Sequence, residues 1–384
     1  MLLEALIIAS ERAANIARKC REDEHLFKLL IEEKSEDEAN PRFVQDFKTL
    51  ADVLIQETLK HDIGNQYPEM KENIKGEESN VFCNALGERI SVEKLESSTQ
   101  TAELLSKVLN DDPEAAHLLA EEVHRDLTID DVATQRPDVE ISLNYAKLGV
   151  WIDPIDSTAE YINGTKDKDC QDCQDDSQTF STGGLKCVTV LIGVYDLETG
   201  GAIMGIVNQP FSSYQDGRWR GKCYWGVYTD TVKCCSITSD SQTEPSYVKV
   251  GTNVVCLSGS EDQSIKDKLR SGGFELVEAP GAGYKMLATV VGLADVYLLS
   301  KSSTFKWDSC GPHALLRSLS GDIVVFEDAV HRDETISVNY RVDSEAGTNK
   351  IESCCNKGGI IAFRNCSIIN KIVSLLRDEN DGGA

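Results

Sequence analysis

The sequence predicts an α/β protein, in the looser α+β sense, built from two lobes. Three observations support this class. Residues 1–60 carry apolar residues at helical spacing, residues 148–230 are rich in β-branched and aromatic residues, and residues 253–379 alternate strand-like and helix-like runs. A chain of 384 residues is long enough to form two lobes with a sizeable core.

The first lobe is expected to begin with helices and to continue as a sheet. Apolar periodicity predicts helices over 2–18, 43–60 and 101–125, the last one broken near Pro113. Strands are predicted over 148–153, 185–196, 202–211 and 223–230, with a hairpin turn at LETGG after the second strand. The polar run 238–246 is rich in residues that break regular structure, so we place the lobe boundary there, between residues 1–245 and 246–384.

The second lobe is expected to alternate strands and helices. Strands are predicted over 253–258, 322–327 and 358–363, and helices over 308–319 and 366–379. Residues 284–299 are expected to hold a helix that runs into a strand. This alternation predicts helices packed on the faces of a sheet.

Composition and charge narrow the range of partners. The net charge of -25 leaves no excess of lysine and arginine to displace the counterions of a nucleic acid, and it disfavours an anionic membrane surface. Glu4 interrupts the apolar N-terminal run, which indicates an amphipathic helix rather than a signal peptide. We therefore expect a monomer that binds small molecules and neither nucleic acid nor membrane.

Cysteine usage points to a reducing compartment. The 13 cysteines are odd in number and irregular in spacing, so we expect free thiols and a cytoplasmic location. Cys170 and Cys173 form a CxxC within the acidic loop 164–182. Because no second pair follows at suitable spacing, we interpret this segment as a solvated loop rather than a zinc site.

The stretch WIDPIDST, residues 151–158, carries the first sign of chemistry. Asp153 ends an apolar strand, and Asp156, Ser157 and Thr158 are residue types that begin helices. Backbone N–H groups at a helix start bind anions, phosphate included. The stretch therefore offers two hard oxygen ligands beside an anion-binding helix start. Its simpler interpretation is a capped turn between strand and helix.

Other acidic residues stand at comparable places. Glu77 and Glu78 follow a glycine at the end of a short apolar segment, Asp308 begins a helix, and Asp52 lies on an early helix. Taken singly, they fit a solvated loop, a helix cap and the wet edge of a helix. Two carboxylates about 5 Å apart repel by roughly 3 kcal/mol at an effective dielectric constant of about 20, so gathering them in one cleft requires cations.

Taken together, FKTLAD (47–52), GEES (76–79), WIDPIDST (151–158) and WDSC (307–310) form an ordered pattern. This pattern resembles the inositol monophosphatase superfamily of magnesium-dependent, lithium-sensitive phosphatases. The resemblance implies a layered αβαβα sandwich, like the inositol monophosphatase and fructose bisphosphatase folds, with the active site between two lobes. It places most metal ligands in residues 1–245, and Asp308 with the substrate-recognition turn in residues 246–384.

The resemblance also implies a mechanism in which water attacks a phosphate monoester without a phosphoenzyme. The implied ligands of two or three Mg²⁺ ions are Glu77, Asp153, Asp156, Asp308 and the carbonyl of Ile155. Asp52 and Thr158 are implied to orient and deprotonate the water, and Asp52 to border a third metal or lithium position. Ser157 and Thr158 are implied to donate N–H groups to phosphate, and Glu78 to lie behind the ligands. Li⁺ is expected to inhibit by taking one magnesium position.

Substrate contacts follow from the same resemblance. The turn PGAGYK implies that Gly281, Ala282 and Lys285 contact the substrate, together with Asp156 and Asp308 of the metal cluster. For PGAGYK the simpler interpretation is a helix start with Lys285 in solvent. Ser260 matches a further family contact, but Asp262 stands where the family pattern predicts lysine. This departure leaves the binding of a distal phosphate open.

The phrases LKCVTVLIGVYD, NQPF, CYWG and TFKWDSC are similar to the branch of the family that removes the 1-phosphate from inositol polyphosphates such as inositol 1,4-bisphosphate and inositol 1,3,4-trisphosphate. A 3′-phosphoadenosine 5′-phosphate phosphatase is the alternative enzyme, because it shares the core motifs. A non-catalytic protein that binds Mg²⁺ or inositol phosphate is the alternative from another class. The presence of both Asp52 and Thr158 argues against it.

Overall fold

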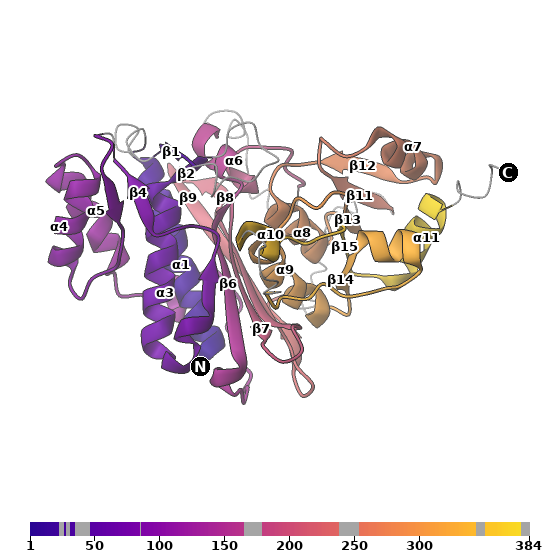
Figure 1. Ribbon diagram of the computed structural model, residues 1–384, viewed down its shortest axis with the longest axis horizontal. Helices are drawn as coiled ribbons and strands as arrows, with labels where there is room; N and C mark the ends of the chain where they lie inside the picture. The colour runs from indigo at the N-terminus through magenta and orange to yellow at the C-terminus, as the bar shows by residue number, and fades with distance from the viewer. Residues whose placement is uncertain are drawn as a thin grey trace.

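The computed structural model of the protein describes residues 1–22, 27, 31–34, 47–84, 86–164, 179–237, 253–342 and 350–377. Its elements form five layers in the order helices, sheet, helices, sheet, helices (Figure 1). The predicted αβαβα sandwich is therefore confirmed. The predicted lobe boundary at 238–246 and the pair Cys170 and Cys173 lie outside the described residues.

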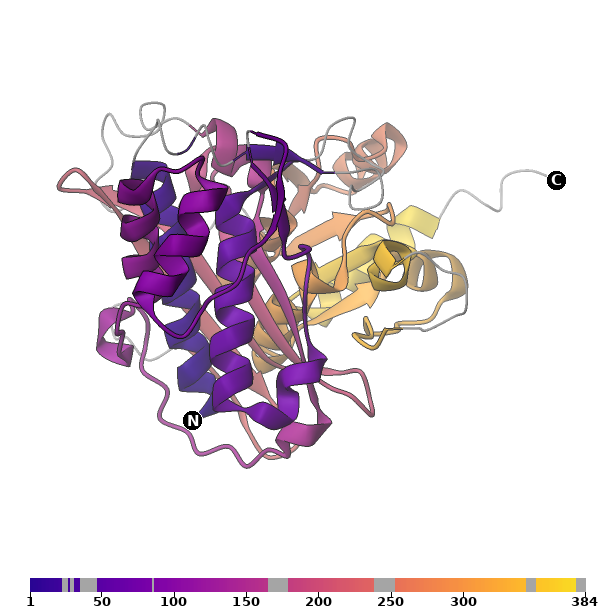
Figure 2. The same ribbon diagram turned by 60° about the vertical axis from the view of Figure 1, so that its left-hand side comes forward.

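The first sheet has six strands in the order β10-β9-β8-β7-β6-β3. Their bounds are β3 Ile74–Gly76, β6 Leu148–Asp156, β7 Thr189–Asp196, β8 Ala202–Gln215, β9 Arg218–Tyr228 and β10 Lys233–Cys235. All neighbours are antiparallel except β3 and β6, which are parallel. Helices α1 (Leu2–Glu22) and α3 (Leu50–Gln66) cover one face of this sheet (Figures 1 and 2).

The second sheet has five strands in the order β12-β11-β13-β15-β14. Their bounds are β11 Val254–Leu257, β12 Glu275–Glu278, β13 Val296–Leu299, β14 Asp322–Val325 and β15 Ile360–Phe363. Helices α8 (Ala282–Val291) and α9 (Lys306–Ser318) form the middle layer between the two sheets, and α7 (Gln263–Ser271) and α11 (Cys366–Arg377) cover the outer face.

The remaining elements surround these layers. They are β1 Ile31–Glu33, β2 Phe47–Thr49, β4 Val81–Cys83, β5 Arg89–Ser91, α4 Ser98–Val108, α5 Pro113–Val123, α6 Thr158–Asn163, α10 Lys350–Cys354, the 3-10 turns η1 Pro68–Asn73, η2 Ile129–Asp131, η3 Tyr145–Lys147 and η4 Leu185–Cys187, and the π turn η5 Asp328–Arg332. Among the described helices, none combines the length and apolar character needed to cross a membrane.

Three glycines let α9 lie directly on the first sheet. Gly193, Gly205 and Gly226 stand side by side in register across β7, β8 and β9, and we call them the glycine row. A Cβ at Gly205 would come 2.0 Å from the carbonyl oxygen of Gly311, and one at Gly193 would come 2.5 Å from the Cβ of Cys310. Side chains at these positions would push α9, and with it Asp308, away from the strands.

The structure corrects some predicted boundaries. The helix expected over 43–60 begins only at Leu50, because Phe47–Thr49 pairs with β1 as strand β2, and residues 43–46 lie outside the description. A capping box fixes this start, since the side chains of Thr49 and Asp52 each bond the other's backbone N–H. The break predicted near Pro113 is confirmed, because α5 begins at that residue.

Candidate active site

A cavity of about 530 Å³ opens at the C-terminal end of β6, against the N-terminal ends of α8 and α9. Ten sequence-predicted residues line it: Glu77, Asp153, Ile155, Asp156, Ser157, Thr158, Gly281, Ala282, Lys285 and Asp308. Asp52, Glu78 and Ser260 are described residues that do not line it. Segments far apart in the chain therefore meet here.

A break in the register of β6 brings Asp153 and Asp156 to the same cavity. Side chains three positions apart in a regular strand point to opposite faces. The pairing of β6 with β7 shifts between Asp153 and Asp156, and this irregularity re-aims the second carboxylate. Ser157 then adopts a left-handed backbone conformation with φ of 72°, which turns the chain into α6. Strand β3 ends beside β6, where the N–H of Glu77 donates to the carbonyl of Ile152.

The centre of the cavity is a cluster of three buried carboxylates. Oxygen atoms of Asp153, Asp156 and Asp308 lie within 4.8 Å of one another. Asp308 comes from the first turn of α9, where its Oδ2 accepts a hydrogen bond from the N–H of Phe305. Burial, with the nearby negative charges, raises the pKa of Asp153 and of Asp308 well above the usual range.

This cluster has the chemistry of a divalent cation site. Each pair of ionised carboxylates repels by roughly 3 kcal/mol at 4.8 Å and an effective dielectric constant of about 20. Asp153 Oδ1 is buried and has no hydrogen-bond partner among the residues that the structure describes. Hard oxygen ligands that converge with an unsatisfied acceptor fit Mg²⁺ or a similar hard cation.

Hydrogen bonds from distant segments hold Asp156 in place. Its oxygens accept hydrogen bonds from Thr189 Oγ1 at 3.1 Å and from the N–H groups of Ala282 and Gly283 at 3.1 and 3.0 Å. The helix α8 thus points its N-terminal N–H groups at a carboxylate. Burial raises the pKa of Asp156 to about 6, and nearby Lys285 opposes this shift. The sequence analysis missed Thr189 and Gly283, although GAG before a helix hinted at the glycine.

The proposed water-activating residues have local partners in the structure. Asp52 is 1% exposed, and its Oδ2 accepts hydrogen bonds from the N–H and the hydroxyl of Thr49 at 2.7 and 2.6 Å. Thr158 Oγ1 donates to the carbonyl of Ile155 at 3.1 Å. Burial raises the pKa of Asp52 to about 7. Direct pairing of Asp52 with Thr158 stays a prediction, and Thr49 is a partner that the sequence analysis missed.

Glu78 lies behind the cavity and shares one lysine with Glu77. Lys34 Nζ lies 2.7 Å from a carboxylate oxygen of each of these residues. Burial raises the pKa of Glu78 to about 8. The amide of Gln56 bonds the backbone N–H and carbonyl of Glu78, and a Cβ at Gly76 would fall 2.0 Å from Gln56 Oε1. This contact explains the glycine of GEES, whereas nothing in the pattern pointed to Lys34.

The predicted recognition turn lies on the wall of the cavity. Gly281 has φ of +75°, which favours glycine, and it precedes the first turn of α8. Lys285 is 4% exposed; its ammonium group donates to the carbonyl of Ala279 and lies 5.2 Å from the ring centroid of Tyr297. Lys285 is therefore buried at the cavity, not placed in solvent as the simpler interpretation held.

Asp262, which stands where the family pattern predicts lysine, serves as the cap of a helix. Its carboxylate accepts a hydrogen bond from the N–H of Ser264 and caps α7. Ser258 and Gly259 line the cavity in place of the predicted Ser260. Lys301 donates to the carbonyl of Ser260, so a lysine does lie beside this loop, but it comes from another segment.

Comparison with known proteins agrees with this architecture. A family model described as the inositol monophosphatase family matches residues 56–350. The chain belongs to the inositol monophosphatase family. Inositol polyphosphate 1-phosphatase of Mus musculus is 42% identical over 392 residues, which cover 98% of this chain and 96% of that protein. The protein of the same name from Homo sapiens is also 42% identical, with the same coverage.

More distant family members give weaker matches. The 3'(2'),5'-bisphosphate nucleotidase 1 of Mus musculus is 29% identical and covers 46% of this chain and 49% of that protein. The crystal structure of Staphylococcal IMPase-I complexed with products superimposes with a TM-score of 0.51 at 10% identity, over 96% of this chain and 92% of that chain. At this identity the structural match supports the family fold and nothing finer.

Proposed function

We propose that the protein is a phosphoric monoester hydrolase that removes the 1-phosphate from inositol polyphosphates such as inositol 1,4-bisphosphate and inositol 1,3,4-trisphosphate. The observation that carries this proposal is the similarity to inositol polyphosphate 1-phosphatases along 98% of the chain. The bisphosphate nucleotidases match less than half of the chain at 28 to 29% identity in mouse, rat and human. The nucleotide phosphatase therefore stays the second candidate.

We infer that Glu77, Asp153, Asp156, Asp308 and the Ile155 carbonyl hold two or three Mg²⁺ ions. When bound, such ions supply Lewis-acid activation of water and charge compensation for phosphate. The buried carboxylate cluster and the unsatisfied Asp153 Oδ1 support this inference. Inhibition by Li⁺ at one of these positions belongs to the same proposal.

The chain's own groups supply proton transfer and orientation. Asp52, with a pKa raised to about 7 by burial, suits a proton acceptor near neutral pH. Thr49 donates two hydrogen bonds to Asp52 Oδ2 and so orients this carboxylate, while Thr158 is the first residue of α6. The N–H groups of Ser157 and Thr158 are proposed to bind the departing phosphate. Lys285 is proposed to bind a second phosphate of the substrate.

The cellular setting is part of the proposal. Every cysteine in the described part of the chain is a free thiol, which suits the reducing cytoplasm. The net charge of -25 suits a monomer with small-molecule ligands and without nucleic-acid or membrane partners. We also propose the division into residues 1–245 and 246–384, since the first sheet uses strands before residue 236 and the second uses strands after residue 253.

The test is phosphate release from inositol 1,4-bisphosphate, inositol 1-phosphate and 3′-phosphoadenosine 5′-phosphate, each with Mg²⁺ and with or without Li⁺. We expect the highest kcat/KM for the inositol bisphosphate, loss of turnover on chelation, and inhibition by Li⁺. Preference for the nucleotide would select the second candidate. Absence of release from all three substrates would select the non-catalytic binding protein.

A further inference from the structure

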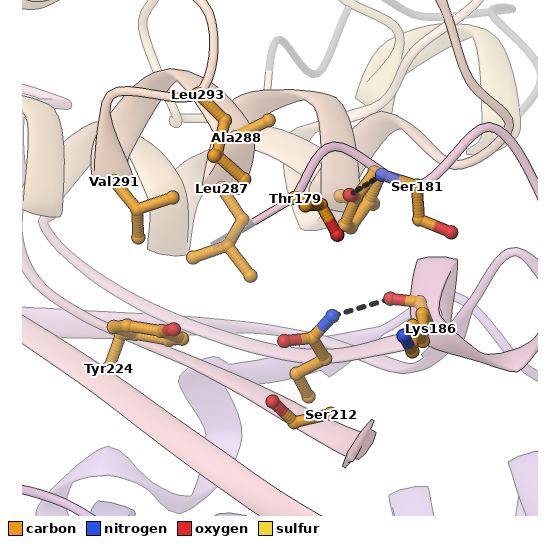
Figure 3. Close-up of a pocket in the computed structure, with 11 residues that line it drawn as sticks. Thr179, Ser181, Lys186, Ser212, Tyr224, Leu287, Ala288, Val291 and Leu293 are labelled. Atoms are coloured by element: carbon orange, nitrogen blue, oxygen red, sulfur yellow. Dashed lines mark hydrogen bonds between the residues drawn. The ribbon is translucent and has the colours of Figure 1, made fainter. Parts of the chain in front are cut away.

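Two further cavities lie away from the catalytic cleft. The smaller cavity, about 20 Å³, lies between α8 and β8, and the larger, about 410 Å³, lies along β9. Ser212 and Tyr224 line both, so the two cavities adjoin. Figure 3 shows Leu287 and Val291 of α8 on one side of the smaller cavity and Tyr224 and Ser212 on the other.

An irregularity in the first sheet opens this space. The pairing of β8 with β9 runs from Gln209 opposite Lys222 to Ser213 opposite Arg220, so three residues of β8 face Gly221 alone. Such a bulge disrupts the ladder and re-aims the side chains within it. Ser212 lies in the bulge, is 6% exposed, and lines both cavities.

The charge of the lining is opposite to that of the protein. Aspartate and glutamate number 64 in a chain with a net charge of -25, yet among the described residues neither type lines these two cavities. Lys186 and Lys222 do line them. Lys222 is half-buried and has no ion pair in the described part of the chain; its ammonium group lies 5.3 Å from the ring centroid of Tyr224. Gln209, directly across from Lys222, donates its side-chain amide to the carbonyl of Lys186 and links the two lysine positions.

We propose that these adjoining cavities form a second binding site for a small phosphorylated molecule, separate from the catalytic cleft. Lys222 would bind the phosphoryl group, and the hydroxyls of Ser212 and Thr134 would bind its oxygens or neighbouring hydroxyls. Thr134 Oγ1 lines the larger cavity and is buried without a hydrogen-bond partner among the described residues, which is costly unless something occupies the space beside it. A volume of about 410 Å³ is in the range of small-ligand pockets. The site rests on this lining and not on the proposed function of the cleft.

The test measures binding of inorganic phosphate to the full chain in excess EDTA, by isothermal titration and by the rise in Tm. Chelation leaves the catalytic carboxylates without cations, so they repel phosphate, and binding reports on the second site. We expect one phosphate per chain. Lys222→Gln is expected to weaken binding by about tenfold or more, since a hydrogen bond to a charged group contributes about 1.5–3 kcal/mol. Ser212→Ala is expected to weaken it less, and it serves as the second variant if Lys222→Gln fails to fold.

Lys233→Gln is the matched control, because Lys233 lies on neighbouring β10 with its ammonium group on exposed Ser320. This variant is expected to bind phosphate as the unmodified chain does. Titrations with inositol 1-phosphate and with inositol separate a phosphorylated polyol from free phosphate as the preferred occupant. Absence of phosphate binding in EDTA, or equal binding by Lys222→Gln, Ser212→Ala and the unmodified chain, would overturn the proposal.

Discussion

Thr189→Val isolates the contribution of one hydrogen bond to metal binding. Valine keeps the shape of threonine but removes the hydroxyl that donates to Asp156 Oδ2 at 3.1 Å. Asp156 would keep the N–H groups of Ala282 and Gly283, so its position should change little. Loss of a hydrogen bond to a buried charged group costs about 1.5–3 kcal/mol, part of which the remaining donors compensate. We expect the concentration of Mg²⁺ at half-maximal activity to rise about 5- to 30-fold, which corresponds to about 1–2 kcal/mol.

The assay is the Mg²⁺ dependence of phosphate release from inositol 1,4-bisphosphate, with kcat measured at saturating metal. Because the lost donor stabilised the ionised form of Asp156, the pKa of that carboxylate should rise further, and the acid limb of the pH profile should move to higher pH. Thr101→Val is the control, since Thr101 is equally buried but bonds Leu95 and His124. An unchanged Mg²⁺ requirement in Thr189→Val, or the same rise in Thr101→Val, would refute the reasoning.

Three further predictions concern the same site. Asp153→Asn should abolish turnover, a loss larger than the roughly 10- to 100-fold typical of groups that only orient a metal ligand. It should also raise the Tm of the chelated protein, because it removes a repulsive buried charge. A lower Tm would contradict this. Burial raises the pKa of Asp156, Asp52 and Glu78 to about 6, 7 and 8, so the folded, chelated protein binds more protons than the unfolded chain. The stability that these three carboxylates contribute should be fully present below about pH 4, be lost as pH rises through 8, and recover with Mg²⁺, as followed by Tm; no fall in the Tm of the chelated protein between about pH 6 and 8 would count against the shifts. Lys301→Met should raise KM for inositol 1,4-bisphosphate several-fold and leave KM for inositol 1-phosphate unchanged, because its ammonium group donates to the carbonyl of Ser260 beside the cavity. Equal effects on both substrates would show that Lys301 does not contact a distal phosphate.

The sequence predicted those site residues that belong to short local motifs. Asp153 and Asp156 lie at the end of a strand as the motif indicated, and Asp308 begins its helix, so all three line the cavity. Local patterning could not show that the register of β6 breaks between the two strand carboxylates. Without that break, alternation would have sent them to opposite faces.

The supporting residues escaped prediction because their roles arise only in the folded chain. Thr189 lies 33 positions after Asp156, and Gly283 lies 127 positions after Asp156. Separations of this size cannot be related by helical or strand periodicity. Lys34 reaches Glu77 from a segment 43 positions away. Thr49 was within reach of sequence reasoning, since threonine three residues before an acidic residue is a capping signature, but the expected helix 43–60 concealed it.

The glycine row sets how freely the carboxylates can move apart. With the backbone of α9 resting on β7, β8 and β9, Asp308 cannot withdraw from Asp153 and Asp156 without lifting a whole helix off the sheet. The like charges are therefore held together before any cation arrives, and little of the free energy of ion binding goes into assembling the ligands. Substituting one of these glycines, which touch no ligand atom, would displace α9 and Asp308 and so weaken ion binding.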